Sequence, residues 1–336
     1  MRVLVTGGAG FIGSNFVRFA LQRHPDWRIT VLDKLTYAGN LANLDDIRDR
    51  ICFVRGDIAN RSDVEPLVSD CDLLINFAAE SHVDRSILWA DDFVRTDILG
   101  TYVLLEAARQ HRLHRFIQIS TDEVYGSAVT GSFTEESPLN PRNPYSASKA
   151  GADRLAFAYF VTHNVPVIIT RCSNNYGPYQ HPEKFIPLCI TNALEDQPLP
   201  IYGDGRQVRD WIHVLDHCDA LDFLIAHGQP GETYNIAGGQ EHENIHIART
   251  ILETLGKPPS LIRHVADRPG HDRRYSLSTD KLARLGWRPQ RQLQDGLRET
   301  IEWYRRHRSW WEPIKSGAFR DYYKKQYGAR LSASLP

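Results

Sequence analysis

The stretch RVLVTGGAGFIG, residues 2–13, decides the fold of this protein. It begins as a short apolar strand, turns through Gly7 and Gly10, and continues past Gly13 into a helical pattern. Such a glycine turn is typical of dinucleotide binding, because the first glycine permits the tight turn, the second lets the backbone approach a pyrophosphate, and the third allows close helix–strand packing. The helix N-terminus then offers unpaired N–H groups to the phosphates. The stretch therefore predicts a strand, turn and helix that bind a dinucleotide.

Strand-like runs follow one another along the first half of the chain and alternate with amphipathic stretches. They cover residues 29–33, 52–57, 73–79, 115–121 and 165–171. Because strands separated by helix-length segments need crossover connections, the sheet should be parallel and helices should cover both of its faces. The pattern predicts an α/β protein with a doubly wound parallel sheet of the Rossmann type.

After the last of these runs the alternation gives way to segments punctuated by proline and glycine, which we expect to form loops and short strands. A helical pattern at 216–228 and a strand pattern at 233–239 should return to the sheet. We therefore expect a Rossmann domain over residues 1–172, with its sheet completed by segments near 210–240. Residues 173–330 should form a smaller, mainly substrate-binding lobe that is interleaved with it.

An acidic residue at the end of the second strand indicates which dinucleotide is bound. Asp33 lies twenty positions after Gly13, where a carboxylate can accept hydrogen bonds from the adenosine ribose and repel a 2′-phosphate. This favours NAD over NADP. Asp57 follows the third strand and fits a further contact to the adenine, with a solvated aspartate at a strand end as the alternative interpretation.

Composition excludes several classes of protein. The 336 residues carry a formal net charge of −1, so no global attraction to nucleic acid is expected, and no apolar run is long enough to span a membrane. The N-terminal sequence lacks the pattern of a signal peptide, which predicts a cytoplasmic protein. Five scattered cysteines without a Cys-x-x-Cys pair argue against disulfides and against a metal site.

Aromatic and basic residues mix at 303–328, where amphipathic helices are favoured over a surface that stacks nucleic-acid bases.

Two short patterns carry candidate chemistry. Tyr145 and Lys149 are spaced i and i+4, on one face of an expected helix, where the ammonium should lower the pKa of the phenol and make it a usable base. Thr121, Asp122 and Glu123 follow the strand at 115–121, at the carboxyl edge of the sheet where ligands bind. A solvated acidic turn is the alternative for this acid pair.

Taken together, these motifs resemble the extended short-chain dehydrogenases/reductases, and within them the dTDP-glucose 4,6-dehydratase family. The resemblance covers nearly the whole chain. The stretches that carry it are GGAGFIGSN, LDKLTYAGN, NFAAESHVDRS, STDEVYG, NPYSASKAG, RCSNNYGPYQHPEKFIP, LPIYGDGRQVRDWIHV and DRPGHDRRYS. The Thr-Asp-Glu sequence is the discriminating one, since epimerases of the same superfamily keep the tyrosine–lysine pair and lack the acid pair.

The resemblance implies a three-stage reaction. Tyr145 would take the proton of the sugar C4 hydroxyl as hydride passes to NAD⁺. Glu123 would then remove the C5 proton while Asp122 protonates the departing C6 hydroxyl, so that water leaves. Elimination needs a base and an acid at once, so the environments of the two carboxyls should keep one ionised and the other protonated. Return of a hydride to C6 and of a proton to C5 would yield a 4-keto-6-deoxy sugar, with Thr121 near O4 and Lys149 also holding the nicotinamide ribose.

The resemblance also implies the contacts of both ligands. The cofactor NAD would contact Gly7, Gly10, Phe11, Ile12, Gly13, Asp33, Lys34, Thr36, Asp57, Ile58, Ala79, Ser81, Thr96, Tyr145, Lys149 and Asn175, with Glu80 beside them. The substrate dTDP-glucose would contact His82, Thr121, Asn174, Lys184, Tyr202, Arg209, Asn244, Arg268 and His271. Among these, Arg209 and Arg268 suit a diphosphate, because guanidinium groups form bidentate pairs with phosphate oxygens.

Three alternatives stay open at this point. A dehydratase for a UDP- or GDP-linked sugar would share every motif, a nucleotide-sugar 4-epimerase would need no acid pair, and an NAD-binding sensor without catalysis would need no intact tyrosine–lysine pair. The helix that begins at Tyr145 and the stretch at 99–110 are apolar on more than one face, which predicts a homodimer through these helices. Burial of the same faces by the chain's own tail is the alternative.

Overall fold

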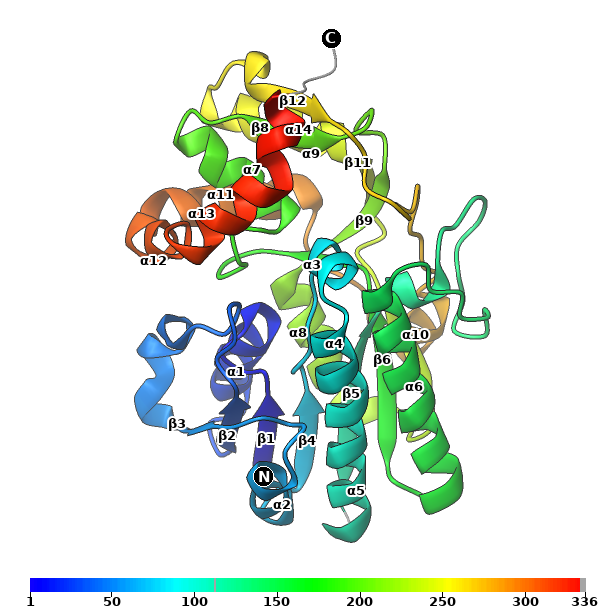
Figure 1. The fold of residues 1–336 in the computed structure, drawn as a ribbon. Helices are drawn as coiled ribbons and strands as arrows, with labels where there is room; N and C mark the ends of the chain where they lie inside the picture. Colours follow the sequence, from blue (N-terminus) through cyan, green and yellow to red (C-terminus); the bar gives the residue numbers. More distant parts are fainter. Residues whose placement is uncertain (112, 333–336) are drawn as a thin grey trace.

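A seven-stranded parallel sheet organises the molecule, with strands in the order β10-β6-β5-β4-β1-β2-β3. The computed structural model describes residues 1–111 and 113–332. The strands of this sheet are β1 (Arg2–Thr6), β2 (Arg28–Asp33), β3 (Ile51–Arg55), β4 (Leu73–Asn76), β5 (Arg115–Thr121), β6 (Val167–Cys172) and β10 (Thr233–Ile236). Figure 1 shows helices on both sides of the sheet. The predicted fold class, a doubly wound Rossmann sheet, is confirmed.

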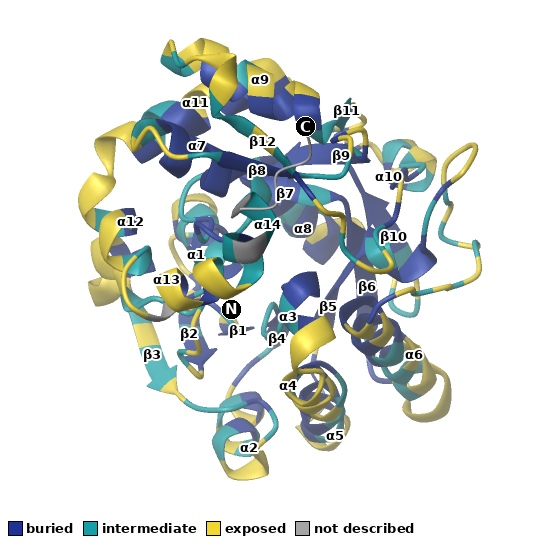
Figure 2. Ribbon diagram, turned by 45° about the horizontal axis from the view of Figure 1, so that its top comes forward, coloured by how far each residue is buried: buried dark blue, intermediate teal, exposed yellow. Residues whose placement is uncertain are grey.

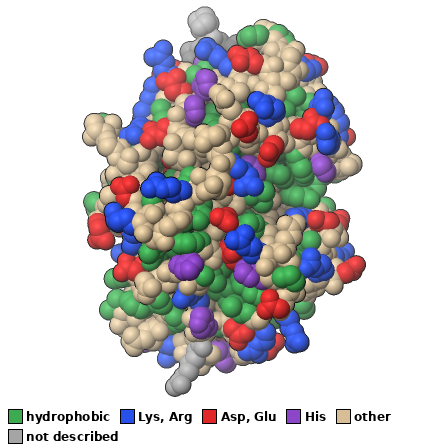
Figure 3. Space-filling model, turned by 180° about the vertical axis from the view of Figure 1, so that it is seen from behind, with side chains coloured by type: hydrophobic (Ala, Val, Ile, Leu, Met, Phe, Trp, Pro, Cys, Tyr) green, Lys and Arg blue, Asp and Glu red, His purple; other side chains and the backbone are tan. Residues whose placement is uncertain are grey.

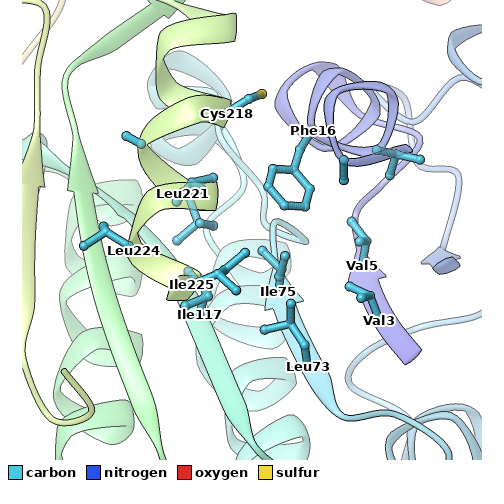
Figure 4. Packing of buried hydrophobic residues seen from close by; sticks show 14 of the residues in the cluster. Val3, Val5, Phe16, Leu73, Ile75, Ile117, Cys218, Leu221, Leu224 and Ile225 are labelled. Atoms are coloured by element: carbon cyan, nitrogen blue, oxygen red, sulfur yellow. The ribbon is translucent and has the colours of Figure 1, made fainter. Parts of the chain in front are cut away.

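Alternation of side chains along the strands builds two cores, one on each face of the sheet. Val3 and Val5 point to the face covered by α1 (Phe11–Arg23) and α8 (Val214–His227), where Figure 4 shows them packed with Phe16 and Leu221. Leu4 points to the opposite face, in the cluster that includes residues of α2, α5 and α6. Those helices are α2 (Arg61–Ser69), α5 (Thr101–His111) and α6 (Pro144–His163).

The later part of the chain forms two small sheets above the carboxyl edge of the large one (Figure 1). One contains β7 (Asn174–Tyr176), β9 (Val208–His213) and β11 (Glu241–Glu243), and the other pairs β8 (Leu199–Tyr202) with β12 (Ile262–Val265). The helices here are α7 (Phe185–Leu194), α9 (Asn244–Leu255), α10 (Asp280–Leu285), α11 (Leu293–Arg306), α12 (Arg308–Ile314), α13 (Ala318–Tyr323) and α14 (Ala329–Ser332), with the π-helix η6 (Lys324–Gly328) between the last two. Residues of α7, α9, α11 and α12 share a separate apolar core.

Short helices fill the remaining connections. They are α3 (Val83–Leu88), α4 (Asp91–Phe93), the π-helix η3 (Val94–Gly100), and the 3₁₀ helices η1 (Leu41–Asn43), η2 (Asp45–Arg50), η4 (Asp122–Tyr125) and η5 (Pro259–Leu261). No helix in residues 1–111 and 113–332 is long and apolar enough to cross a membrane. Charged side chains of both signs are intermixed on the face seen in Figure 3.

The structure differs from the sequence-based prediction at α7. We expected loops and short strands directly after residue 172, but FIPLCITNAL at Phe185–Leu194 is a ten-residue helix. Eight consecutive residues of it, 186–193, are buried, so the sequence has no polar face from which a helical period could be recognised. In the tail, by contrast, Tyr304 and Trp311 are buried as the prediction of amphipathic helices requires, and Figure 2 shows exposed residues along the outer side of these helices.

The helix and strand patterns predicted to return to the large sheet appear as α8 and β10. Strand β10 pairs in parallel with β6 at the edge of the sheet, and α8 packs against α1. The chain leaves the large sheet after Cys172, and β7 then pairs with β9. The division into two functional domains near residue 172 stays a prediction.

Candidate active site

The glycine turn lies between β1 and α1 and leaves no room for side chains. A Cβ atom on Gly7, whose φ is 68°, would lie 2.5 Å from the backbone nitrogen of Ala78, and one on Gly13 would lie 2.4 Å from the carbonyl oxygen of Gly7. Neither contact is tolerable, so the turn can form only with glycine at these positions. Gly10 precedes the first turn of α1, whose free N–H groups face the cleft that begins here.

One cleft runs from this turn along the carboxyl edge of the sheet to the acid pair. All sixteen residues expected at the cofactor line it, as do Glu80 and the three catalytic candidates Thr121, Asp122 and Glu123. The sequence separates these residues by up to 168 positions, but the parallel strands end side by side and bring them together. A dinucleotide cradle and an acid–base cluster therefore share one cleft.

Asp33 holds the glycine turn as well as facing the cleft. Its Oδ2 atom accepts a hydrogen bond from the N–H of Ala9 at 2.9 Å, and its Oδ1 atom accepts one from Leu35 at 2.8 Å. Burial raises the pKa of Asp33, and the two N–H groups oppose that shift. Each oxygen retains a second lone pair, so the carboxylate can still accept from a ribose hydroxyl.

Asp57 is not a freely solvated residue at a strand end. Its carboxylate pairs with the ammonium of Lys34 at 2.9 Å and accepts the N–H of Ala59 at 2.9 Å. These partners outweigh burial and lower the pKa of Asp57. The pair closes the end of the cleft remote from the acid cluster, between β2 and β3.

The first two turns of α6 position the side chains of Tyr145 and Lys149. The helix begins with a capping box, in which Asn143 and Ser146 exchange side-chain-to-backbone hydrogen bonds, and with Pro144 in its first turn. Tyr145 and Lys149 are both buried and line the cleft. The Lys149 ammonium donates a hydrogen bond to the carbonyl of Ile119 at 2.7 Å, which ties α6 to β5 beside the acid pair.

The expected effect of Lys149 on the phenol is wrong for this structure. The pKa of Tyr145 is raised well above its usual value, first by burial and then by the carboxylates of Glu123 and Asp97. A hydrogen bond with the Thr121 side chain opposes the rise, but Lys149 is not among the strongest influences. The ammonium is directed to a backbone carbonyl, so proximity in sequence did not give the predicted electrostatic pairing.

The two adjacent acids, Asp122 and Glu123, differ in how deeply they are buried. Asp122 is 2% exposed, and burial followed by the charge of Glu123 raises its pKa well above the usual value. Thr121 donates a hydrogen bond to its Oδ1 atom at 3.1 Å, and its Oδ2 atom is buried with no partner among the described residues. Glu123 is only partly buried and accepts a hydrogen bond from the hydroxyl of Tyr275 at 3.3 Å. Asp122 is therefore suited to hold a proton, and Glu123 to take one.

The residues expected at the substrate fall into two groups. Thr121, Asn174 and Lys184 line the cleft, and Lys184 donates to the carbonyl of Ser81 at 2.5 Å. The others do not line it and lie in the upper lobe or next to it: His82, Tyr202, Arg209, Asn244, Arg268 and His271. Tyr202 and Arg268 meet at the carboxylate of Asp84, at 2.9 and 2.8 Å. Asn244 is the first residue of α9, and its Oδ1 atom is buried with no partner among residues 1–111 and 113–332.

Sequence reasoning missed several polar residues in the cleft or directly behind its lining. Asp97 is 1% exposed and lies on η3, where its carboxylate accepts hydrogen bonds from the N–H of Glu80 at 2.9 Å and from the hydroxyl of Ser148 at 2.5 Å. It thereby joins a lining residue of the cleft to the residue next to Lys149. A single acid within VRTDILGTY gives no signal in the sequence, and the structure places it buried on the π-helix Val94–Gly100. Further residues of the cleft that were not predicted include Cys172, Gln180, His181 and Glu183.

The burial of Asp97 has a measurable consequence. Burial raises its pKa to about 6 against an ordinary value of 3.8, although Lys149 and the two hydrogen bonds oppose the rise. Because the pKa of Asp97 is higher in the folded than in the unfolded protein, protonated Asp97 stabilises the fold at pH values below the unfolded-state pKa. This stabilisation is lost as the pH rises through the folded-state pKa. We expect the free energy of unfolding to fall from about pH 4 to about pH 7 more steeply in the unaltered protein than in Asp97→Asn. Urea titrations across that range measure both slopes, and equal slopes would contradict the assignment.

The fold and the cleft define the class of protein. A Rossmann sheet with this glycine turn, a tyrosine–lysine pair at the start of α6 and a second lobe above the carboxyl edge is an extended short-chain dehydrogenase/reductase. The chain belongs to the nucleotide-sugar dehydratase family whose sequence model is described as GDP-mannose 4,6 dehydratase, which matches residues 4–300.

Individual relatives agree with that assignment. A dTDP-glucose 4,6-dehydratase from Streptomyces niveus is 54% identical over 323 residues, covering 94% of this chain and 96% of the relative. The crystal structure of DesIV, a dTDP-glucose 4,6-dehydratase from Streptomyces venezuelae, was solved with NAD and dTDP bound. Its sequence is 52% identical to this one, and the two structures align with a TM-score of 0.90 over 94% of this chain and 100% of DesIV. A UDP-glucose 4-epimerase from Thermus thermophilus, solved with NAD, is 30% identical with a TM-score of 0.85 over 91% of this chain and 99% of its own.

Proposed function

We propose that this protein is an NAD-dependent 4,6-dehydratase that converts dTDP-glucose to dTDP-4-keto-6-deoxyglucose and water. The observation that carries the proposal is the presence, in one cleft, of Tyr145, the buried Asp122 and the more open Glu123. The relatives at about half identity act on dTDP-glucose, according to their names. An epimerase has no elimination to perform and hence no use for an acid and a base adjacent to each other.

The residues of the chain divide the chemistry among them. Tyr145 takes the proton from the C4 hydroxyl as the phenolate, the form that its hydrogen bond with Thr121 favours against the effect of burial. The ketone formed at C4 acidifies the C5 proton, which Glu123 removes. Asp122, kept protonated by burial and by the charge of Glu123, gives its proton to the C6 hydroxyl so that water departs. The cluster thus places a carboxyl whose pKa is raised next to a second, more open carboxyl, the pairing that an elimination by an acid and a base requires.

NAD fits the glycine turn and the cleft, since the cradle at Gly7 and Gly13 excludes any Cβ and the Asp33 carboxylate faces the ribose position. When bound, NAD⁺ would supply the acceptor for the C4 hydride and the donor for its return to C6, and Glu123 would return the proton to C5. We propose that Lys34, Thr36 and Asp57 hold its adenosine half, and that Tyr145, Lys149 and Asn175 hold its nicotinamide half. The other predicted cofactor residues line the cleft between these ends.

The upper lobe supplies the cationic groups for the nucleotide. Arg209 is buried over the ring of Tyr275 at 4.2 Å, and its charged hydrogen bonds go to backbone carbonyls rather than to a carboxylate. Arg268 keeps its Nε atom buried and unpartnered among the described residues. We propose that these two groups bind the diphosphate, and that His82, Asn174, Lys184, Tyr202, Asn244 and His271 surround the rest of the substrate.

The test is to incubate the purified protein with dTDP-glucose and, separately, with UDP-glucose, and to follow product mass and the absorbance of the 4-keto sugar in base. A product lighter by one water from dTDP-glucose supports the proposal. A galactose product of unchanged mass would replace it with a 4-epimerase. Dehydration of UDP-glucose alone would change the substrate class, and no reaction with either would favour another sugar nucleotide.

We also propose a homodimer formed through α5 and α6. Phe157 and Val161 on α6 are 40% and 60% exposed, and Leu99, just before α5, is 40% exposed. Figure 1 shows the two helices side by side on the outside of the sheet, so an apolar surface spans both. Four of the five cysteines are buried as free thiols, which fits our further proposal of a cytoplasmic enzyme.

The dimer gives a further prediction. Val161→Asp places a charge on the proposed interface and should convert the dimer to a monomer, since desolvating an unpaired carboxylate is costly. Sedimentation velocity measures the change, and Val129→Asp is the matched control because Val129 is 89% exposed and lies outside α5 and α6. A monomeric unaltered protein, or a variant that stays dimeric, would contradict the proposal.

A further inference from the structure

The C-terminal segment, residues 318–332, reaches back to a residue expected at the substrate. The side-chain amide of Gln326 donates to the hydroxyl of Tyr202 at 2.7 Å and to the carboxylate of Asp84 at 3.0 Å. Tyr202 donates to the same carboxylate at 2.9 Å, and the ring of Tyr327 lies 5.9 Å from that of Tyr202. The segment therefore holds the side chain of Tyr202, the last residue of β8, in place.

Positive charge gathers around Tyr202. The guanidinium carbons of Arg330 and Arg268 lie 5.3 and 5.9 Å from the centre of its ring. Asp84 pairs with the Nη1 atom of Arg268 at 2.8 Å and is the carboxylate that also accepts from Tyr202 and Gln326. No ion pair of Arg330 is found among the described residues. The group formed by Tyr202, Asp84, Arg268 and Arg330, which we call the Tyr202 cluster, is thus suited to bind a further anion.

Several buried polar atoms in and around the Tyr202 cluster have no hydrogen-bond partner in the part of the chain that the structure describes. They are Nδ1 of His82, Nε of Arg268, the hydroxyl of Tyr322 and Nη1 of Arg330. His82 and Tyr322 are 6% and 7% exposed, and their rings lie 5.7 Å apart. Buried polar groups are nearly always hydrogen-bonded, because an unsatisfied one is costly. Four together point to a polar ligand, and two of the four belong to the C-terminal segment.

We propose that residues 318–332 form one wall of the nucleotide subsite, in which Arg330 contacts the diphosphate and Gln326 is a positioning residue that holds Tyr202 beside the base. The inference rests on the proposed function for the class of ligand, a nucleotide-sugar. It adds residues from a part of the chain in which the sequence indicated no substrate contact. A guanidinium and a phosphate form charge-assisted, often bidentate hydrogen bonds, which matches the unpartnered Nη1 atom of Arg330.

Two ligands separate the two roles in a binding experiment with the NAD-loaded protein. Isothermal titration with dTDP and with thymidine gives a Kd for each. Arg330→Ala should weaken dTDP about tenfold and leave thymidine unchanged, because only dTDP carries the diphosphate, and Arg330→Lys should recover part of the loss. Gln326→Ala should weaken both ligands severalfold, because it acts through Tyr202. Lys324→Ala, an exposed residue of the same segment, is the matched control.

Melting temperatures and NAD content of the variants show whether folding is intact. In turnover, Arg330→Ala should raise KM for dTDP-glucose and leave kcat nearly unchanged, since Arg330 lies away from the reacting carbons. Equal dTDP affinity in Arg330→Ala and the unaltered protein would overturn the inference, as would an unaltered protein that binds no dTDP. Tight dTDP binding that depends on Arg330, without dehydration of dTDP-glucose, would support this inference while refuting the proposed function.

Discussion

Tyr145→Phe should lower kcat for dTDP-glucose dehydration by about 10³-fold, because the variant has no oxygen to take the C4 proton. We expect no other group to replace it, because burial raises the pKa of Asp122, Lys149 donates to the carbonyl of Ile119, and Glu123 is assigned to the C5 proton. Substrate affinity should change little, since the phenyl ring fills the same buried space. The measurement is single-turnover product formation followed by mass, together with the content of bound NAD.

The matched control is Tyr159→Phe, the same substitution on the same helix. The hydroxyl of Tyr159 donates to Glu106 at 2.6 Å, on the side of α6 that faces α5 and not the cleft. This variant should keep its activity. If Tyr145→Phe retained activity within a few fold of the unaltered protein, the phenol could not be the base, and the mechanism would need another proton acceptor.

Replacing either acid should stop the elimination at a different point. Both Glu123→Gln and Asp122→Asn should lower product formation by about 10²- to 10⁴-fold, the usual contribution of a general acid or base. In D₂O, however, only Glu123→Gln should lose deuterium incorporation at C5 of the recovered sugar, because Glu123 is the group that removes the C5 proton. Asp122→Asn should still exchange at C5, since it lacks only the proton donor for the C6 hydroxyl.

Glu136→Gln is the matched control for the acid pair, because Glu136 is exposed in the loop between β5 and α6 and does not line the cleft. Loss of C5 exchange in Asp122→Asn together with its retention in Glu123→Gln would reverse the two roles. Full activity in both variants would remove the elimination from this cluster. Nuclear magnetic resonance of the recovered sugar distinguishes these results.

Local sequence determined the elements that depend on a few adjacent residues. The glycine turn is readable because Gly7, Gly10 and Gly13 follow a strand directly and form one contiguous pattern, although the backbone that excludes a side chain at Gly7 belongs to the distant Ala78. The acid pair is readable because Asp122 and Glu123 are adjacent and follow a strand whose end must lie at the edge of a parallel sheet. Regular alternation of apolar segments was enough to give the fold class, since a parallel sheet requires crossovers.

Predictions failed where a side chain had alternatives that only the packed structure resolves. Lys149 lies one helical turn from Tyr145, but its ammonium reaches the carbonyl of Ile119, thirty positions away. Helix α7 was not recognised because nearly all of it is buried, and a helix without a polar face has no amphipathic period. In both cases the deciding partner comes from another element of the fold.

The sequence by itself determined the parallel sheet and predicted the glycine cradle from contiguous and periodic patterns, and the resemblance of its motifs to a known family predicted the three residues proposed for proton transfer. Only the tertiary structure decided the electrostatics and the walls of the site. Burial raises the pKa of Asp122, Asp97 is buried on a π-helix, and Gln326 meets Tyr202 across 124 positions. Burial and long-range contact depend on how whole elements pack against one another, and no local pattern of residues encodes them.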